Sequence, residues 1–491
     1  MQKGFVIKSI QLLPKASSLI ESLRDIGYSF ESAVADIIDN SITAKAKNIN
    51  IYFDFKEKKL FLAIIDDGIG MSQDELIEAM RPGTKNPLDS RDENDLGRFG
   101  LGLKTASFSQ CRKLTVVSSQ NNQKTATVWD LDYVAKTEDW SLQILDDSER
   151  SILYKINELK NSGTSVIWEE TDRILDNSVS GANEDVVYEK LEVLQKHLEL
   201  VFHRYLKGKD KINIFINGTQ LKAFDPFFSH HKATQELTEE IITINSEKIK
   251  IIPYILPHYS KVSAQDYKYY SGSGGYLKNQ GFYVYRNRRL LISGTWFRLI
   301  PQSEMYKLAR IQIDLPNNLD DLWKIDVKKS KASPPLIIRH RLKKIIDKIA
   351  GSSTRVYTGR SSVSDKKMAF WERTSARGEI TYSINQNHPI IKNFVKKLKK
   401  EEEHEFGDIL KLISNFFPKD TLYADIGNNN PNLINKLDIP DIELEEMAKD
   451  KISKEKEFMT DTEFIKYFKS TEPFSMYKKD WEEFLDNKEN L

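Results

Sequence analysis

Residues 60–71 read LFLAIIDDGIGM, an apolar run that ends in two aspartates and two alternating glycines. The run Leu60–Ile65 predicts a buried strand, and a carboxylate at the end of such a strand needs hydrogen-bond donors around it. Gly68 and Gly70 let the backbone turn sharply and let a flat ligand approach closely. Asp66 is therefore a candidate acceptor for an exocyclic amine such as that of adenine. The alternatives are a tight strand-to-helix turn or a calcium loop, although an EF-hand loop needs further ligands that are missing here.

Residues 17–45, upstream of this strand, predict two helices, because apolar side chains recur at helical spacing on both sides of Gly27. On the second helix, Asp36 and Asn40 are four residues apart and share a face, while the two isoleucines between them point into a core. A carboxylate can accept a proton from water, and an amide oxygen can ligate Mg²⁺. Alone, such a pair is common on exposed helices, so its meaning depends on the rest of the chain.

Residues 97–107, downstream of the strand, read GRFGLGLKTAS, in which three glycines open a predicted helix. Backbone N–H groups at such a helix start bind phosphate, and Lys104 adds positive charge. The spacing matches neither the Rossmann fingerprint nor a Walker A loop. The preceding stretch 81–98 is polar and long, which favours a functional lid. Further on, the pair Gly163-Thr164 precedes a predicted strand and means little alone.

Taken together and in this order, the four segments resemble the GHKL ATPase superfamily. This superfamily includes gyrase-type topoisomerases, MutL, the ninety-kilodalton heat-shock chaperones, sensor histidine kinases and MORC proteins. The resemblance covers about residues 15–170, extends to about residue 350, and is nearest to prokaryotic MORC-like and MutL-like members. It implies an α+β fold, with an N-terminal Bergerat-type sandwich of helices on a mixed sheet.

The resemblance also implies a role for each matching residue. Asp36 would polarise the attacking water, and Asn40 would hold Mg²⁺ against the phosphates of ATP. Asp66 would accept a hydrogen bond from the adenine amino group, with Thr164 assisting through a water. The rest of the nucleotide site would comprise Gly68, Gly70 and Met71 at the base, Gly97, Arg98, Phe99, Gly100, Leu101, Gly102 and Lys104 at the phosphates, and Thr84 and Lys85 on the lid.

Two positions depart from the family pattern. Asp36 stands where relatives carry a glutamate, and its side chain is one methylene shorter. Thr43 stands where many relatives carry an aspartate. The sequence therefore predicts ATP binding more firmly than rapid hydrolysis.

The chain is expected to contain four parts. These are an ATP-binding domain at 1–180, a transducer-like α/β domain of S5 type at 181–350, a small polar linker at 351–367, and a mostly helical C-terminal region at 368–491. In transducer-like relatives a lysine contacts the γ-phosphate, and Lys331 is our candidate, with a basic surface turn as the equal alternative. The basic run Arg286–Arg289 is interpreted as a solvated hairpin rather than a nucleic-acid contact, because the net charge is near zero.

Composition excludes several other classes. The chain has 491 residues, with 73 Lys+Arg against 72 Asp+Glu, so no global basic field indicates a nucleic-acid binder. Its single cysteine, Cys111, rules out an internal disulfide and favours a small buried side chain. His388 is interpreted as a turn or core histidine rather than a catalyst. No apolar run reaches the roughly 20 residues that span a bilayer, so we expect a cytoplasmic protein without membrane contact.

The expected function is Mg²⁺-dependent ATP binding and slow hydrolysis that drive an ATP-dependent homodimer. By resemblance, its setting would be DNA transactions such as restriction or phage defence, with DNA and nuclease or methyltransferase subunits as partners. The alternatives are a heat-shock-type chaperone and a regulatory ATPase subunit of a nuclease complex. A histidine kinase is disfavoured, because there the ATP domain follows the phospho-accepting helix, whereas here it is N-terminal.

Overall fold

The computed structural model describes residues 14–56, 59–83, 102–174, 184–244, 246–319, 322–324, 333–358, 368–376, 379–418, 421–422, 439–456 and 458–486. The chain divides into two compact units, Met1–Ser353 and Thr354–Leu491. Both contain helices and strands, which confirms the predicted α+β class.

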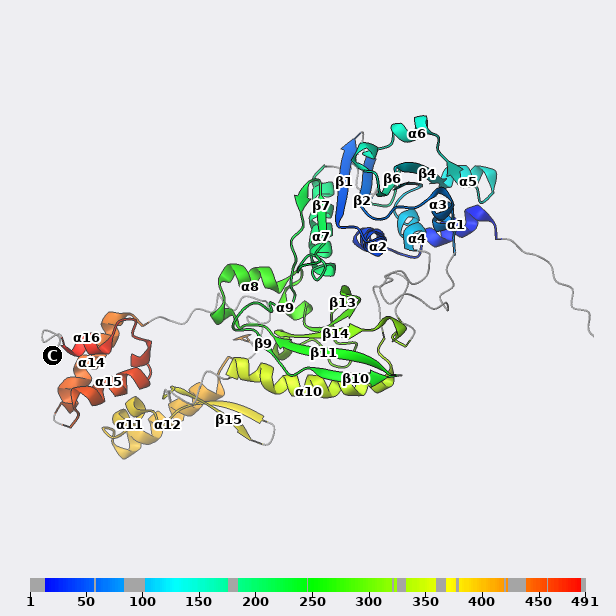
Figure 1. Ribbon diagram of the computed structural model, residues 1–491. Helices are drawn as coiled ribbons and strands as arrows, with labels where there is room; N and C mark the ends of the chain where they lie inside the picture. The colour runs from blue at the N-terminus through cyan, green and yellow to red at the C-terminus, as the bar shows by residue number, and fades with distance from the viewer. Residues whose placement is uncertain are drawn as a thin grey trace, which may run out of the picture. The chain divides into compact units, whose positions relative to one another are not determined.

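The first unit opens with a mixed sheet, in which the described residues form eight strands (Figure 1). Its strand order is β5-β4-β3-β6-β2-β1-β7-β8, and neighbours are antiparallel except for β1 and β7, which are parallel. The strands are β1 (Asn48–Lys56), β2 (Lys59–Asp66), β3 (Lys113–Gln120), β4 (Gln123–Asp130), β5 (Gln143–Ile144), β6 (Gly163–Glu169), β7 (Asn213–Ile216) and β8 (Thr219–Gln220).

Helices cover one face of this sheet and share a single hydrophobic core with it. They are α1 (Ala16–Arg24), α2 (Phe30–Thr43), α3 (Gln73–Met80), α4 (Gly102–Phe108), α5 (Leu131–Thr137) and α7 (Glu184–Val201). The opposite face carries a smaller hydrophobic cluster, to which the 3₁₀ turn η1 (Ile156–Glu158) contributes Ile156. The short helix α6 (Asp147–Ser151) precedes this turn in the chain. The predicted arrangement of helices on one face of a mixed sheet is confirmed.

Local sequence signals account for the helices that carry the candidate site. The side chain of Ser29 accepts from the backbone N–H of Ser32 and so starts α2. Ser72 and Glu75 form a capping box that starts α3, as the sequence predicts for Ser72. On α2 the predicted core residues Ile37 and Ile38 are fully buried.

The first sheet continues past residue 180, where the ATP-binding domain was expected to end. Residues Asn48–Ile51 of β1 pair in parallel with Asn213–Ile216 of β7, and the hairpin at Asn217-Gly218 leads into β8 as predicted. Helix α7 contributes Leu194 and Leu198 to the same core. The first sheet and its hydrophobic core therefore include α7, β7 and β8, up to about residue 221.

A second sheet follows within the same unit. Its order is β10-β11-β14-β12-β13, and β9 pairs with β11. The strands are β9 (Gln235–Glu236), β10 (Glu240–Ile244), β11 (Glu247–Ile255), β12 (Gly281–Arg286), β13 (Arg289–Thr295) and β14 (Ala309–Leu315). Between them lie α8 (Ala264–Ser271), α9 (Gly275–Lys278) and the short 3₁₀ turns η2 (Tyr259–Lys261), η3 (Glu304–Tyr306) and η4 (Asn317–Leu319).

Helix α10 (Leu336–Thr358) runs along this second sheet (Figure 1). Its apolar face is fully buried and comprises Ile338, Leu342, Ile345, Ile346 and Ile349. The predicted linker at 351–367 overlaps its end, since residues 351–358 are helical. The remainder of that segment, 359–367, lies outside the described residues.

The second unit is mostly helical, with one hairpin that the sequence did not indicate. Its elements are β15 (Trp371–Ala376), β16 (Glu379–Ile384), α11 (Pro389–Val395), α12 (Lys400–Asn415), α14 (Asp441–Glu455), α15 (Asp461–Ser470), η6 (Phe474–Met476) and α16 (Trp481–Asp486). His388 is fully buried and stacks on Phe370 with 4.0 Å between ring centroids, which confirms its interpretation as a core histidine.

Two further expectations concern single features. Cys111 is fully buried just before β3, as predicted, and burial raises the pKa of its thiol. In the parts of the chain that the structure describes, no helix is both long enough and apolar enough to cross a bilayer.

Candidate functional site

Asp66 ends β2 inside a cradle of hydrogen-bond donors. One carboxylate oxygen accepts from the backbone N–H of Gly68 at 2.9 Å and of Thr164 at 3.2 Å, and the other accepts from Ser41 Oγ at 2.8 Å. Burial raises the pKa of Asp66, and these three donors oppose that shift. Because a carboxylate offers about four acceptor positions, the cradle leaves capacity for one further donor.

The neighbouring Asp67 has a structural role. Its carboxylate accepts from the backbone N–H groups of Lys47 and Asn48 at 2.7 and 2.8 Å, and from the Asn48 side chain at 2.6 Å. These bonds lower its pKa against the effect of burial. The two aspartates thus have different roles. Asp67 joins β1 to the turn after β2, whereas Asp66 keeps acceptor capacity for a ligand.

The glycines of the motif are required by close contact between backbone segments. A Cβ added to Gly70, whose φ is +69°, would lie 1.9 Å from the carbonyl oxygen of Ser119 on β3. A Cβ added to Gly163 would lie 2.0 Å from the carbonyl oxygen of Asp66. The turn after β2 is therefore pressed against β3 and β6, and this contact brings Thr164 to Asp66.

Replacing Gly70 with alanine is expected to lower the free energy of unfolding by about 3 kcal/mol or more, because strain at positive φ adds to displacement of the strand. Gly218→Ala is the matched control. Gly218 also has a positive φ of +81°, but nothing lies within 4 Å of its added Cβ. Urea unfolding of both variants measures the difference, and equal losses would show that the backbone contact is unimportant.

Ser118 on β3 joins two of the predicted site residues and was missed by the sequence reasoning. Its hydroxyl accepts from the backbone N–H of Met71 at 2.8 Å and lies 3.1 Å from Thr164 Oγ1. A serine within a buried strand gives no local signal of this role, since its partners come from two other parts of the chain.

Asp36 lies on α2, the helix that also supplies Ser41 to the Asp66 cradle. It is only 3% exposed, and one of its oxygens accepts from the Tyr28 hydroxyl at 2.9 Å. Asn40, one turn later, exposes its side chain. A Cβ on Gly102 would lie 3.8 Å from the same Asp36 oxygen, so the start of α4 adjoins the carboxylate. Two of the four predicted segments are thereby brought together.

Lys104 lies away from this junction. It is 3% exposed, and its ammonium group donates to the carbonyl oxygen of Ala79 near the end of α3 at 2.8 Å. Burial lowers its pKa to about 8. Its contact with phosphate therefore stays a prediction. Unlike Lys104, several predicted site residues lie outside the described ranges: Thr84, Lys85, Gly97, Arg98, Phe99, Gly100, Leu101 and Lys331.

The basic hairpin between β12 and β13 corrects one expectation. Arg286 and Arg289 were interpreted as solvated, yet they are 3% and 4% exposed. Arg289 Nε lies 2.7 Å from the carboxylate of Asp39, and Arg289 Nη2 lies 3.5 Å from Asp36. The solvated interpretation is wrong for these two residues. For Arg289 the reason is that two carboxylates on α2 compensate its buried guanidinium.

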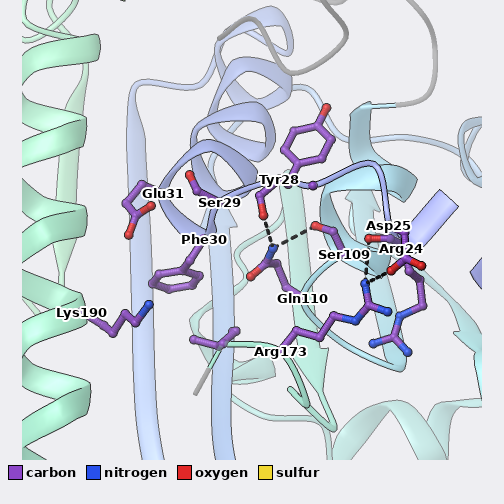
Figure 2. Close-up of a pocket in the computed structure, with 12 residues that line it drawn as sticks. Arg24, Asp25, Tyr28, Ser29, Phe30, Glu31, Ser109, Gln110, Arg173 and Lys190 are labelled. Atoms are coloured by element: carbon purple, nitrogen blue, oxygen red, sulfur yellow. Dashed lines mark hydrogen bonds and ion pairs between the residues drawn. The ribbon is translucent and has the colours of Figure 1, made fainter. Parts of the chain in front are cut away.

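A polar pocket of about 430 Å³ lies beside the start of α2. Figure 2 shows the residues that line it. Gln110 projects into it and donates to Ser109 Oγ, and the backbone of Tyr28 forms part of its wall. Its two arginines are engaged by acidic neighbours, Arg24 by Asp172 and Arg173 by Asp25. The pocket is lined by the α1–α2 connection, by the segments that follow α4 and β6, and by α7. None of the residues of the Asp66 cradle lines it.

Among the described residues, no group of three or more His, Cys, Asp or Glu side chains is arranged to hold a metal ion. The exposed amide of Asn40 is an oxygen ligand of the kind that Mg²⁺ accepts. Magnesium in nucleotide sites commonly takes few protein ligands together with phosphates and waters, so a single amide ligand from Asn40 fits a magnesium site of this kind.

Comparison with known proteins gives one family and several relatives. Residues 28–164 match the family described as histidine kinase-, DNA gyrase B-, and HSP90-like ATPase. These residues include Tyr28, Asp36, Asp66 and Thr164, so the match covers both helix α2, which carries Asp36, and the Asp66 cradle.

Several relatives match a part of the chain at modest identity. ATPase morc-1 of Caenorhabditis elegans is 33% identical over 95 residues, 19% of this chain and 11% of that protein. Chaperone protein HtpG of Rickettsia canadensis is 31% identical over 132 residues, 25% and 20% respectively. DNA mismatch repair protein MutL of Koribacter versatilis is 34% identical over 104 residues, 20% and 16%. The chain thus matches at most a fifth of the length of these relatives.

Proposed function

The chain belongs, through residues 28–164, to the GHKL ATPase superfamily, and from this premise we propose that it binds Mg·ATP and hydrolyses it slowly. The observation that carries the proposal is the Asp66 cradle. Three donors hold the carboxylate at the end of β2, and it retains acceptor capacity for an exocyclic amine.

The helix α2 would supply the hydrolytic side of the site. Asp36 would accept a proton from water, and the Tyr28 hydroxyl, which donates to it, would hold the carboxylate in orientation. Asn40 would hold Mg²⁺, which when bound neutralises phosphate charge. The aspartate is buried and short, and this supports slow turnover, since the attacking water must come close to α2.

We further propose that ATP favours a homodimer acting on DNA, with nuclease or methyltransferase subunits as partners. The similarity to a protein named for DNA mismatch repair supports the DNA setting. The similarity to several HtpG proteins favours a chaperone as the second candidate. DNA binding by the purified chain would favour the first, and suppression of client aggregation would favour the second.

Light scattering coupled to gel filtration tests the proposed switch. The full chain is expected to double its mass with Mg²⁺ and a non-hydrolysable ATP analogue, and to return to its starting mass with ADP. ATP binding without any change of mass would keep the nucleotide site and exclude ATP-dependent dimerisation.

A further inference from the structure

Arg289 connects the second sheet to α2, the helix that carries Asp36, the candidate proton acceptor. It opens β13, and its guanidinium reaches α2, where Nε lies 2.7 Å from Asp39 and Nη2 lies 3.5 Å from Asp36. All three side chains are at most 5% exposed. A third nitrogen, Nη1, donates to the carbonyl oxygen of Leu290 at 3.3 Å. The guanidinium is therefore held by three separate groups.

Charge explains why a guanidinium is present here. Asp36 and Asp39 are three residues apart on one helix and are both buried, so their like charges repel in a poorly solvated setting. A buried carboxylate is tolerated only with a partner. The planar fork of arginine can serve two carboxylates at once, which the single ammonium of a lysine cannot do in the same geometry.

The two oxygens of Asp36 thus have different partners. Tyr28 donates to Oδ2 at 2.9 Å, and Arg289 approaches Oδ1 at the longer distance of 3.5 Å. Proximity of Asp36 raises the pKa of Tyr28, in addition to the larger effect of burial. The carboxylate is oriented from one side by its own domain and from the other side by the second sheet.

The second sheet determines where this guanidinium lies. The turn that precedes Arg289 is tied to the segment following α7, because the Tyr205 hydroxyl donates to the carbonyl oxygen of Asn287. Beside it, His203 Nε2 lies 2.8 Å from the Tyr285 hydroxyl of β12. A displacement of the β12–β13 hairpin would carry Arg289 away from α2.

We propose that Arg289 is a positioning residue for ATP hydrolysis, holding the Asp36 carboxylate in place and making turnover depend on the contact between the second sheet and α2. This inference rests on the proposed ATPase function. Arg289 does not touch the nucleotide in this role, and it acts through Asp36 alone.

A pair of neutral substitutions separates positioning from folding. Arg289→Gln and Asp39→Asn each leave a buried charge with fewer partners, so each is expected to lower the unfolding temperature. The double variant replaces the Arg289–Asp39 ion pair by two amides that can bond each other and leaves Asp36 with the Tyr28 hydroxyl, so its unfolding temperature is expected to recover in part. Its kcat is nevertheless expected to stay about 10- to 100-fold below that of the original chain, with the KM for ATP changed less than about twofold.

The exposed neighbour Arg288 supplies the matched control, since Arg288→Gln removes the same charge from the same turn. Its kcat is expected to be unchanged. Recovery of both unfolding temperature and kcat in the double variant would reduce Arg289 to a structural residue and overturn the inference. Unchanged kcat in Arg289→Gln would do the same. An original chain that binds no Mg·ATP would instead overturn the proposed function together with this inference.

Discussion

Asp66→Asn will weaken ATP binding by roughly 100-fold or more while the chain stays folded. The asparagine oxygen can still accept from the backbone N–H groups of Gly68 and Thr164, and the Ser41 hydroxyl can accept from its amide nitrogen. An adenine amine would then meet an amide donor in place of a carboxylate. Because burial already raises the pKa of Asp66, losing its charge costs the fold little.

Calorimetric titration with Mg·ATP and a thermal melt measure the two halves of this expectation. Asp74→Asn is the matched control, because Asp74 is exposed on α3 and makes the same change of charge away from the cradle. Unchanged affinity in Asp66→Asn would show that the nucleotide base is recognised elsewhere. A collapsed melt in that variant would assign the carboxylate to folding instead.

Asp36→Ala will lower kcat by about 10²- to 10⁴-fold and leave the affinity for Mg·ATP within a few fold. The variant removes the candidate proton acceptor from α2, whereas Asp66 at the end of β2 keeps its three hydrogen-bond donors. Asp36→Asn refines the test, since its amide oxygen can still accept from the Tyr28 hydroxyl. It preserves that contact and removes the basicity.

Phosphate release under saturating ATP, with binding followed separately, provides the measurement. Equal losses of kcat in the alanine and asparagine variants would assign the effect to basicity. If both variants turn over at the original rate, Asp36 has no part in the reaction, and a different group must activate the water.

Local patterns predicted the parts of the site that depend on one segment. Helical spacing placed Asp36 and Asn40 on α2, and the apolar run of β2 placed Asp66 at its end. Both outcomes follow from periodicity, which a single stretch of sequence contains. The glycines were also recognised, although for Gly70 the contact that forbids a side chain is with the protein's own strand β3.

Residues that act across the fold could not be predicted in this way. Arg289 is separated from Asp39 by 250 positions, and its basic neighbours suggested a solvated turn. The roles of Ser41 and Ser118 could not be predicted, because their hydroxyl groups bond to residues on other strands or loops and follow no periodic pattern in the sequence. The end of α10 shows the same limit. Residues 351–358 are rich in small polar side chains, yet helix propagation continues through them.

The parallel pairing of β1 with β7 determines how this protein can be divided. The matched family segment ends at residue 164, but β1 finds its second neighbour about 50 positions later, at Asn213–Ile216. A fragment cut at either 164 or 180 would leave part of β1 as an open strand edge, with backbone groups available to pair with other chains. The first sheet is therefore incomplete without residues 213–220, and the same stretch of chain leads on into the second sheet, which carries Arg289.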